Sequence, residues 1–511
     1  MKLRRFINAT RSRLSSRSVA AFLLPISLWC GVPCVAADPR PLPQFERIVI
    51  DDHFPGVYQV EVADVNGDGK PDVVALGGGT CAWYENPTWK KRIVTNPKQT
   101  PGIISTATAD LDGDGKAEIA IGYEFSMNQP TKGKLLLAHP GKGLDDPWAL
   151  VPVADVPSIH RIRWMHREGY IGKNSAHLGS PPADPKLAKD VRLMRSTALV
   201  VAPIFGPSAK PPLFAEEPAH LTLFNVYLPK DLVPRNGGGG GLGGGGGLGG
   251  GGIPGGGIGG GGGLGGGGGL GGGGIQTGEL GGGAQSSKPI DPRPRLGYPG
   301  KTPQEPSLAS EIGRVPVIHA IEVAVIRPNL PPFVVAASNL GVTITYVAAI
   351  SGGELYATNP LVPGAPGDAP KVGASEVHMG HFKNGREFLA TVEPWHGTDV
   401  AIYESVPTEL NFFPKFGPRT LIDSTLKDGH ALWVADVDGD GDDEVFAGYR
   451  GQGTSLLGYD FDGKTWNRTV IDTAIAAQDL RGGDLDGDGT PDIVAVGGST
   501  HNVVWYRPKK D

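Results

Sequence analysis

The chain has 511 residues and a formal net charge of −6, with 53 acidic residues against 47 Lys and Arg. This excess of acid argues against a nucleic-acid partner, because affinity for nucleic acid comes largely from cations that neutralise phosphates. The length suits two or three average domains or one large repeat array.

The first 37 residues are predicted to be an export signal that is removed from the mature protein. They carry six Lys and Arg residues and no acid, followed by an apolar stretch from Val19 to Val32. That stretch is short for a membrane span, and Val35-Ala36-Ala37 offers the small residues of a cleavage site before Asp38. Removal leaves 41 cations against 53 acids, a net charge of −12, and Cys81 as the single cysteine. We expect a secreted or periplasmic protein without a later membrane span or an intramolecular disulfide.

Four copies of one acidic loop follow the pattern Asp-x-Asp/Asn-Gly-Asp-Gly-x-x-Asp/Glu. Each copy places side-chain oxygens at positions 1, 3, 5 and 9 and a backbone carbonyl at position 7, and its Gly residues allow a tight wrap. This pattern is typical of a cage for a hard cation, and we predict a Ca²⁺ in each loop that braces the turn between two strands. The predicted ligands are Asp64, Asn66, Asp68, Asp72, Asp110, Asp112, Asp114, Glu118, Asp436, Asp438, Asp440, Glu444, Asp484, Asp486, Asp488 and Asp492.

The loops mark a repeat that predicts the fold. Each is followed by a short β run such as Ile493–Val496, and sequential loops start 46 to 48 residues apart within each pair. The same strand form occurs three more times without a loop, at Leu199–Pro203, Phe333–Ala337 and Phe388–Val392, and a further strand follows in all seven units. Seven units of about four short strands predict an all-β fold, a seven-bladed β-propeller.

We expect the propeller to occupy residues 38–511 and to close on itself. The last unit has no outer strand of its own, and a matching segment, Phe45–Asp51, precedes the first unit. We predict that this N-terminal strand joins the last blade and removes the exposed edge. The expected blades span about residues 57–97, 100–155, 158–228, 314–362, 373–425, 428–474 and 476–507.

Two insertions interrupt this pattern. Residues 237–274 hold 31 of the 80 Gly, and Pro-rich flanks extend the segment to about residues 229–306. It buries too little side chain to offset its ordering entropy, so we predict that it is disordered and separates blades three and four. A smaller polar insertion, about residues 169–196, falls inside blade three and has room for a short helix.

A column of polar residues is predicted to line the channel. The position six residues before each cation loop lies on the innermost strand, and the blades without a loop can be aligned by their inner strands. From blade one to blade seven the column is Tyr58, Ile104, His160, His319, His378, His430 and Gln478. Four imidazoles converging on the axis can bind Zn²⁺, Mn²⁺ or another borderline cation, with Tyr58 and Gln478 beside them. A ring of packed, hydrogen-bonded core histidines is the alternative.

Weaker candidates lie outside this column. His396 and His501 stand near strand ends and are expected at one mouth of the channel, and Glu376 and Glu393 are candidate acids.

Two family resemblances follow from these motifs. The four loops resemble the FG-GAP or VCBS repeats of integrin α-type propellers, which implies the fold. A second set of segments is similar to the propeller of the aldos-2-ulose dehydratase family, and this set is Ser158–Trp164, Leu199–Gly206, Gly373–His378, Phe388–Gly397, Asp428–Leu432 and Thr500–Asn502. That resemblance implies dehydration of keto-sugars such as 1,5-anhydrofructose and glucosone. Metal-dependent oligouronide lyases are similar in principle, with a His-bound metal in a seven-bladed propeller.

The favoured hypothesis is therefore a metal-dependent sugar lyase or dehydratase that performs β-elimination on a keto-sugar or uronide. A metal held by His160, His319, His378 and His430 would stabilise the enolate oxygen, and Tyr58 or an uncoordinated His would remove the α-proton. The alternative is a non-catalytic propeller that binds glycans or proteins in adhesion. A third hypothesis is a scaffold that displays the glycine-rich segment.

Overall fold

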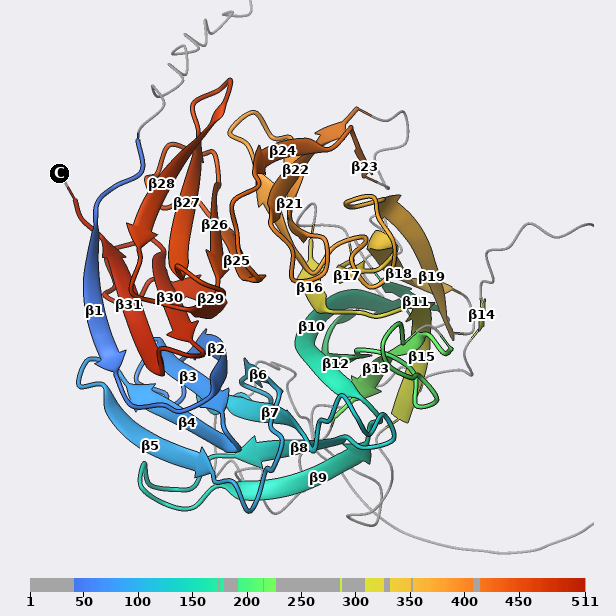
Figure 1. Cartoon of the computed structure of the whole chain (residues 1–511). Coiled ribbons are helices and arrows are strands. Elements are labelled where there is room, and N and C mark those ends of the chain that lie inside the picture. The colour runs from blue at the N-terminus through green and yellow to red at the C-terminus, as the bar shows by residue number, and fades with distance from the viewer. Residues whose placement is uncertain are drawn as a thin grey trace, which may run out of the picture. The chain divides into compact units, whose positions relative to one another are not determined.

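The protein is described by a computed structural model that covers residues 41–172, 175–178, 192–214, 216–226, 285–286, 308–325, 331–350, 353–407 and 414–510. These residues form seven antiparallel sheets around a channel, and no helix occurs among them (Figure 1). The prediction of an all-β, seven-bladed propeller is confirmed. The predicted export signal lies outside the described residues. Within those residues, nothing helical has the length and apolar character needed to cross a bilayer.

The first three blades run from the innermost strand outward. Blade one consists of β2 (Val57–Ala63), β3 (Asp72–Gly77), β4 (Thr80–Glu85) and β5 (Lys90–Thr95). Blade two consists of β6 (Ser105–Ala109), β7 (Glu118–Tyr123), β8 (Lys134–His139) and β9 (Ala149–Asp155). Blade three consists of β10 (Ile159–Gly172), β12 (Arg192–Pro203), β13 (Ala219–Asn225) and β15 (Leu308–Val315), with β11 (Ser175–Leu178) beside β10.

The remaining blades follow the same order. Blade four consists of β16 (Ala320–Ala324), β17 (Phe333–Ser338), β18 (Gly341–Ile350) and β19 (Gly353–Val362), with β14 (Gln285–Ser286) paired to β19. Blade five consists of β20 (Glu376–His381), β21 (Glu387–Glu393), β22 (Asp399–Val406), β23 (Lys415–Phe416) and β24 (Thr420–Asp423). Blade six consists of β25 (Gly429–Ala435), β26 (Glu444–Tyr449), β27 (Ser455–Phe461) and β28 (Trp466–Asp472). Blade seven consists of β29 (Ala477–Gly483), β30 (Asp492–Gly497), β31 (Asn502–Pro508) and β1 (Phe45–Asp51).

The ring closes through the two ends of the propeller, as predicted. β1 pairs antiparallel with β31, from Phe45 opposite Pro508 to Asp51 opposite Val503. In Figure 1 the blue strand β1 lies along the red strand β31. β1 thus becomes the outer strand of blade seven, and that sheet has no unpaired outer edge on β31.

The hydrophobic core lies between the blades. Seven buried clusters each combine side chains from two adjoining blades, and together they continue around the ring. The second strands β3, β17 and β30 are buried along their whole length, which explains why they are short continuous apolar runs instead of alternating patterns. The seven innermost strands contact one another in sequence, so side chains on their free faces meet around the channel.

One expected boundary in blade three is wrong. The glycine-rich segment was expected to separate blades three and four. Instead β15, which follows it, pairs with β13, from Ala219 opposite Val315 to Asn225 opposite Leu308. The segment therefore joins the third and fourth strands of one blade. An antiparallel pair tolerates so long a connection because the entropy cost of loop closure grows slowly with length. The predicted disorder of residues 229–306 falls almost entirely outside the described residues.

The smaller insertion also begins and ends differently. β10 and β12 continue their antiparallel ladder as far as Ile171 opposite Arg192. Residues 169–172 and 192–196 are therefore strand and not loop. Residues 173–174 and 179–191, where a short helix had room, lie outside the described residues.

Tyrosine hydroxyls fasten neighbouring blades to each other. Each of three tyrosines on a third strand donates to the aspartate that ends the outer strand of the preceding blade. The pairs are Tyr84–Asp51 at 2.6 Å, Tyr459–Asp423 at 2.7 Å and Tyr506–Asp472 at 2.6 Å. A cation adds a second bond in each case, as Arg468 does to Asp423 at 2.7 Å. Bonds to an ionised, largely buried acceptor are among the stronger hydrogen bonds in proteins.

We predict that Tyr459→Phe lowers the free energy of unfolding at pH 7 by about 1–3 kcal/mol, measured by urea denaturation. Burial alone would raise the pKa of Asp423, but hydrogen bonds from Thr425, Tyr459 and Arg468 bring it below its ordinary value. A folded-state pKa below that of the unfolded chain, about 3.9, stabilises the fold above that pH, and the contribution is lost as the pH falls through the folded pKa. The difference between Tyr459→Phe and wild type should therefore shrink in acid. An equal difference at pH 7 and in acid would contradict this role.

Candidate functional site

A shared irregularity of register brings one residue of most blades to the channel. In blades one, three, six and seven the innermost strand has a β-bulge, and the bulged residues are Tyr58, His160, His430 and Gln478. A bulge re-aims a side chain relative to the regular alternation of a strand. His319 holds the same place in blade four, where its N–H donates to the Ala337 carbonyl at 3.0 Å immediately before β16.

Blade five does not follow the predicted column. The residue equivalent to His319 is Ser375, whose N–H donates to the Val392 carbonyl at 2.8 Å. His378 lies three residues further along β20, and its Nδ1 is 3.6 Å from Glu322 Oε1. The alignment was wrong because blade five has no cation loop to set its register, and the short pattern Val-His-Met resembles Ile-His-Ala. His378 is therefore excluded from the central group of imidazoles.

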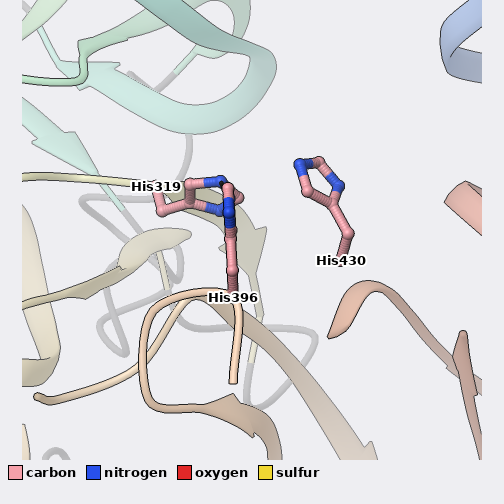
Figure 2. Close-up of side chains that lie close together, drawn as sticks. All are labelled: His319, His396 and His430. Carbon is pink, nitrogen blue, oxygen red and sulfur yellow. Dashed lines mark hydrogen bonds between the residues drawn. The ribbon is translucent and has the colours of Figure 1, made fainter. Parts of the chain in front are cut away.

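Three imidazoles converge instead from blades four, five and six. They are His319, His396 and His430, and one ring nitrogen of each lies within 4.8 Å of those of the other two (Figure 2). The Nε2 atoms of His319 and His396 are 2.8 Å apart, and the ring centroids of His319 and His430 are 5.0 Å apart. His160 lies next to this group, with its ring centroid 5.1 Å from that of His319. We call His319, His396 and His430 the histidine cluster.

His396 was only a weak candidate, because it lies on the loop between β21 and β22 and not on an inner strand. Its φ of 48° is in the left-handed region. Arg450 Nη2 donates to its Nδ1 at 3.0 Å, and Asp428 in turn accepts from Arg450 Nε at 2.7 Å. The sequence places His396 near a strand end, but the position of a loop residue relative to another blade cannot be obtained from strand periodicity.

Backbone carbonyls determine which ring nitrogen of two cluster residues carries the proton. His319 Nδ1 donates to the Ser375 carbonyl at 3.0 Å, and His430 Nδ1 donates to the Gln478 carbonyl at 2.7 Å. With the proton on Nδ1, the Nε2 of each ring carries a lone pair. This arrangement, in which one ring nitrogen donates to a carbonyl and the other keeps a lone pair, is usual for a metal-binding histidine.

Burial keeps the cluster neutral. The pKa values of His160 and His319 are lowered well below the ordinary value by burial and then by the nearby Arg161 cation. Burial, followed by His319, lowers the pKa of His430 and that of His396 as well. Neutral imidazoles are the form that binds metal, so the site needs no proton loss to accept a divalent cation near pH 7.

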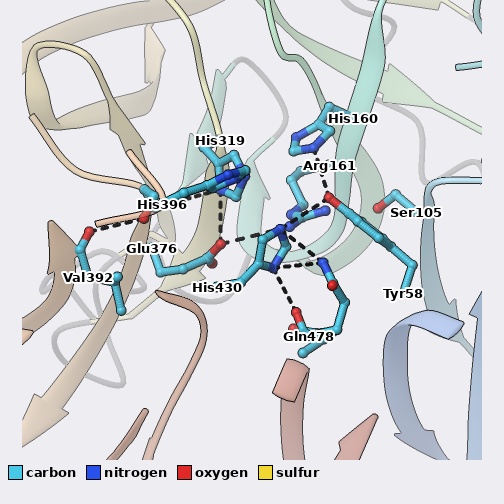
Figure 3. A network of polar contacts seen from close by, with 12 residues as sticks. Tyr58, Ser105, His160, Arg161, His319, Glu376, Val392, His396, His430 and Gln478 are labelled. Atoms are coloured by element: carbon cyan, nitrogen blue, oxygen red, sulfur yellow. Dashed lines mark hydrogen bonds and ion pairs between the residues drawn. The ribbon is translucent and has the colours of Figure 1, made fainter. Parts of the chain in front are cut away.

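Three further polar groups surround the cluster (Figure 3). The Tyr58 hydroxyl lies 3.3 Å from His160 Nε2 and 3.4 Å from His430 Nε2. The Arg161 guanidinium lies 5.3 Å from the centroid of the Tyr58 ring. Glu376 Oε1 lies 3.0 Å from His319 Nδ1 and 3.8 Å from Arg161 Nη2, and burial raises the pKa of Glu376 to about 7. Tyr58 was predicted here and Glu376 was a candidate acid, whereas Arg161 was not assigned a role.

Of the remaining candidates, one lies beside the cluster and two lie away from it. Gln478 is adjacent to the cluster, with its amide nitrogen 3.1 Å from His430 Nε2. Glu393 is fully buried between Tyr403 and Arg419 and belongs to the blade-five core. His501 is exposed, and its Nδ1 accepts from the Gly56 N–H at 3.4 Å.

The donor set of the histidine cluster fits a borderline divalent cation. Three histidines with an open position are the ligands of catalytic zinc sites, with metal–nitrogen distances of about 2.0–2.1 Å. The 2.8 Å between His319 Nε2 and His396 Nε2 is a hydrogen bond in which the His396 Nε2–H donates. For His396 to bind through Nε2, its proton must move to Nδ1, where Asp428 Oδ1 at 3.4 Å would replace the Arg450 N–H as the hydrogen-bond partner.

The four acidic loops adopt one conformation. In loop one the first ligand, Asp64, accepts the N–H groups of Gly67 at 2.7 Å and Gly69 at 2.8 Å. The acid at position 9 is at most 1% exposed in every loop and accepts the N–H of position 2, as Asp72 does from Val65 at 3.0 Å. In the other three loops carboxylate oxygens gather within 4.8 Å of one another. The geometry is compatible with the predicted Ca²⁺ sites, which stay a prediction.

Comparison with known proteins supports the fold. Residues 64–121, which include two of the acidic loops, match the FG-GAP-like repeat family. The protein is a seven-bladed propeller that contains an FG-GAP-like repeat. No curated protein matches its sequence.

Several solved structures show a distant likeness to this propeller. BBS1N in complex with ARL6DN has 8% identity and a TM-score of 0.42, over 91% of this chain and 96% of that one. A candidate 6-phosphogluconolactonase of Bacteroides uniformis has 10% identity and a TM-score of 0.35, over 87% and 89%. The extracellular domain of a candidate one-component system of B. thetaiotaomicron has 9% identity and a TM-score of 0.39, over 91% and 40%. At these values the likeness carries no information about activity.

The histidine cluster predicts opposite results for two histidines of blade five. His396→Ala should weaken binding of a transition metal by at least about tenfold, because it removes a ligand from the cluster. His378→Ala is the matched control and should leave the metal content unchanged. Elemental analysis of the purified chain after dialysis against limiting Zn²⁺ measures both. Equal metal loss in the two variants would contradict the assignment.

The acidic loops predict a calcium-dependent stability. Asp436→Asn removes the charge of the first ligand in blade six, so it should lower the number of bound Ca²⁺ by one per chain and reduce the rise in Tm that Ca²⁺ produces. Calorimetric titration and thermal unfolding with Ca²⁺ and with a chelator provide the two readouts. A Tm that does not respond to Ca²⁺ in the wild-type chain would show that the loops are stable without the cation.

Proposed function

We propose that the protein is an exported, metal-dependent carbon–oxygen lyase that acts on a keto-sugar or uronide by β-elimination in the channel of the propeller. The observation that carries this proposal is the meeting of three neutral imidazoles, His319, His396 and His430, at a place where a tyrosine hydroxyl and a buried guanidinium also converge. Isolated core histidines do not need two tautomers that are each fixed by a backbone carbonyl.

Substrate approaches the cluster from the side of His396. The side chain of His396 is 24% exposed, whereas that of His319 is 3% exposed. Two cations flank this side, because Arg450 bonds to His396 and the Lys371 ammonium donates to the Trp395 carbonyl at 2.9 Å. The Trp395 ring lies 5.5 Å from that of His396. Cations together with an indole face suit a polyhydroxylated or acidic sugar, whose C–H face is apolar and whose hydroxyl and carboxyl groups accept hydrogen bonds.

A divalent cation held by the histidine cluster would supply a Lewis acid that stabilises negative charge developing on a substrate oxygen. Arg161, which lies beside Tyr58 and Glu376, keeps a fixed positive charge next to the reacting groups. Glu376 contacts His319 through Nδ1 and holds that ring in place.

Tyr58 and His160 are placed to handle the proton. The Tyr58 oxygen, deprotonated beside the Arg161 guanidinium and positioned 3.3 Å from the neutral His160 Nε2, removes the proton from the carbon next to the substrate carbonyl. The electron pair of the C–H bond becomes the new C=C bond, and the C–O bond at the β-carbon breaks. The Tyr58 hydroxyl then gives this proton to the departing oxygen, so that water or an alcohol leaves and Tyr58 regains its starting state.

Two further parts of the proposal concern the rest of the chain. Ca²⁺ in the acidic loops of blades one, six and seven would brace the turns between the first and second strands of those blades. Residues 1–37 would direct export to the periplasm or the exterior and would then be removed.

The proposal predicts that Tyr58→Phe lowers kcat by about 10²–10⁴-fold while the transition-metal content stays that of wild type. The double variant His319→Ala/His430→Ala should lose the channel metal and turnover, and His378→Ala should keep both. Turnover is followed as the ultraviolet absorption of the unsaturated product from 1,5-anhydrofructose, glucosone and oligouronides.

A wild-type chain that holds the metal but converts none of these substrates would contradict the lyase assignment. Glycan binding that persists in His319→Ala/His430→Ala would then support the non-catalytic binding propeller.

A further inference from the structure

One strand position faces the cation loop in four different blades. In each of these blades the second strand begins at the acid in position 9 of the loop, and the third strand runs antiparallel beside it. One residue of the third strand therefore lies opposite that acid. That position holds Glu85 in blade one, His139 in blade two, Asp460 in blade six and Arg507 in blade seven. The four loops are alike in sequence, so this neighbour is what distinguishes their surroundings.

His139 is aimed at two of the predicted loop ligands. Its Nε2 lies 3.6 Å from Asp112 Oδ2 and 3.6 Å from Glu118 Oε1. The side chains of His139, Asp112 and Glu118 are 11%, 2% and 0% exposed. All three of these facing atoms are buried without a hydrogen-bond partner. Buried polar atoms are normally satisfied, so three at one point require an explanation.

The tautomer of His139 shows that its Nε2 carries no proton. Its Nδ1 donates to the Pro140 carbonyl at 2.8 Å, so the neutral ring turns an Nε2 lone pair towards the two carboxylate oxygens. A separation of 3.6 Å is too long for a hydrogen bond, and nothing among the described residues provides a proton or a cation between them. Three electron-rich atoms in a buried place repel one another unless a cation lies between them.

We propose that blade two binds a borderline divalent cation of the zinc class through Asp112, Glu118 and His139, in contrast to the all-oxygen Ca²⁺ sites predicted for the other loops. Nitrogen and oxygen ligands about 2.0–2.2 Å from a tetrahedral Zn²⁺ are about 3.3–3.6 Å from each other, which matches the 3.6 Å from His139 Nε2 to each of the two carboxylate oxygens. Imidazole favours Zn²⁺ and its neighbours over Ca²⁺, which takes oxygen ligands.

The corresponding residues in the other blades do not offer this donor set. Arg92 donates to Glu85 at 2.7 Å in blade one. Asp460 is a further oxygen donor in blade six, and Arg507 lies 3.8 Å from Asp486 in blade seven. The blade-two site stands on the third strand, outside the channel, so it does not depend on the proposed lyase activity. A cation there would tie the end of β8 to the loop that precedes β7.

The test is a Zn²⁺ titration of the full chain in excess Ca²⁺, with the histidine cluster removed by His319→Ala/His430→Ala. This parent should bind one Zn²⁺ per chain. Adding His139→Ala should weaken that binding by at least about tenfold, and adding Asp460→Ala, at the same position in blade six, should leave it unchanged. His139→Gln, which preserves side-chain volume, replaces His139→Ala if the smaller residue prevents folding.

Crystals of the wild-type chain soaked in Zn²⁺ provide a readout that needs no variant. An anomalous peak at the zinc edge between His139, Asp112 and Glu118 would support the site. Equal Zn²⁺ affinity with and without His139, or no anomalous peak there, would overturn the proposal and leave an imidazolium–carboxylate ion pair as the explanation.

Discussion

Closure of the ring by pairing of β1 with β31 is the constraint on which the remaining structure depends. The seven hydrophobic clusters lie between blades and not within them, so each blade is stabilised only by having neighbours on both sides. Because the ring is closed, the innermost strands converge on one channel, and residues separated by more than two hundred positions, such as Tyr58 and His430, come within hydrogen-bonding distance. Tyrosine–aspartate hydrogen bonds between adjacent blades add directional contacts to this non-directional hydrophobic packing.

Two chemically different kinds of site arise on this framework. The acidic loops are built from carboxylate oxygens and backbone N–H groups at the turns between strands, a donor set suited to a hard cation. The channel holds neutral imidazoles, whose charge is suppressed by burial and by Arg161. The oxygen ligands at the turns would stabilise the strands, whereas the nitrogen ligands at the axis would serve the chemistry proposed in the channel. His139 is the point at which the two donor types meet, since it adds an imidazole to an acidic loop.

The sequence was informative wherever a loop determined the register of the following strands. In blades one, six and seven the six-residue offset from the loop correctly located Tyr58, His430 and Gln478, because loop length and bulge position are linked on the same hairpin. His378 was misassigned where no loop anchored the alignment. His396 could be located only in three dimensions, because its position depends on how a loop of blade five approaches blades four and six.

The histidine cluster is the centre of the functional account, and X-ray absorption at the zinc edge of the His139→Gln protein tests it most directly. With the blade-two site removed, the retained Zn²⁺ reports the channel alone. The account predicts a first shell with three imidazole nitrogens at about 2.0–2.1 Å. A first shell of oxygen only, or no zinc retained after dialysis, would contradict it.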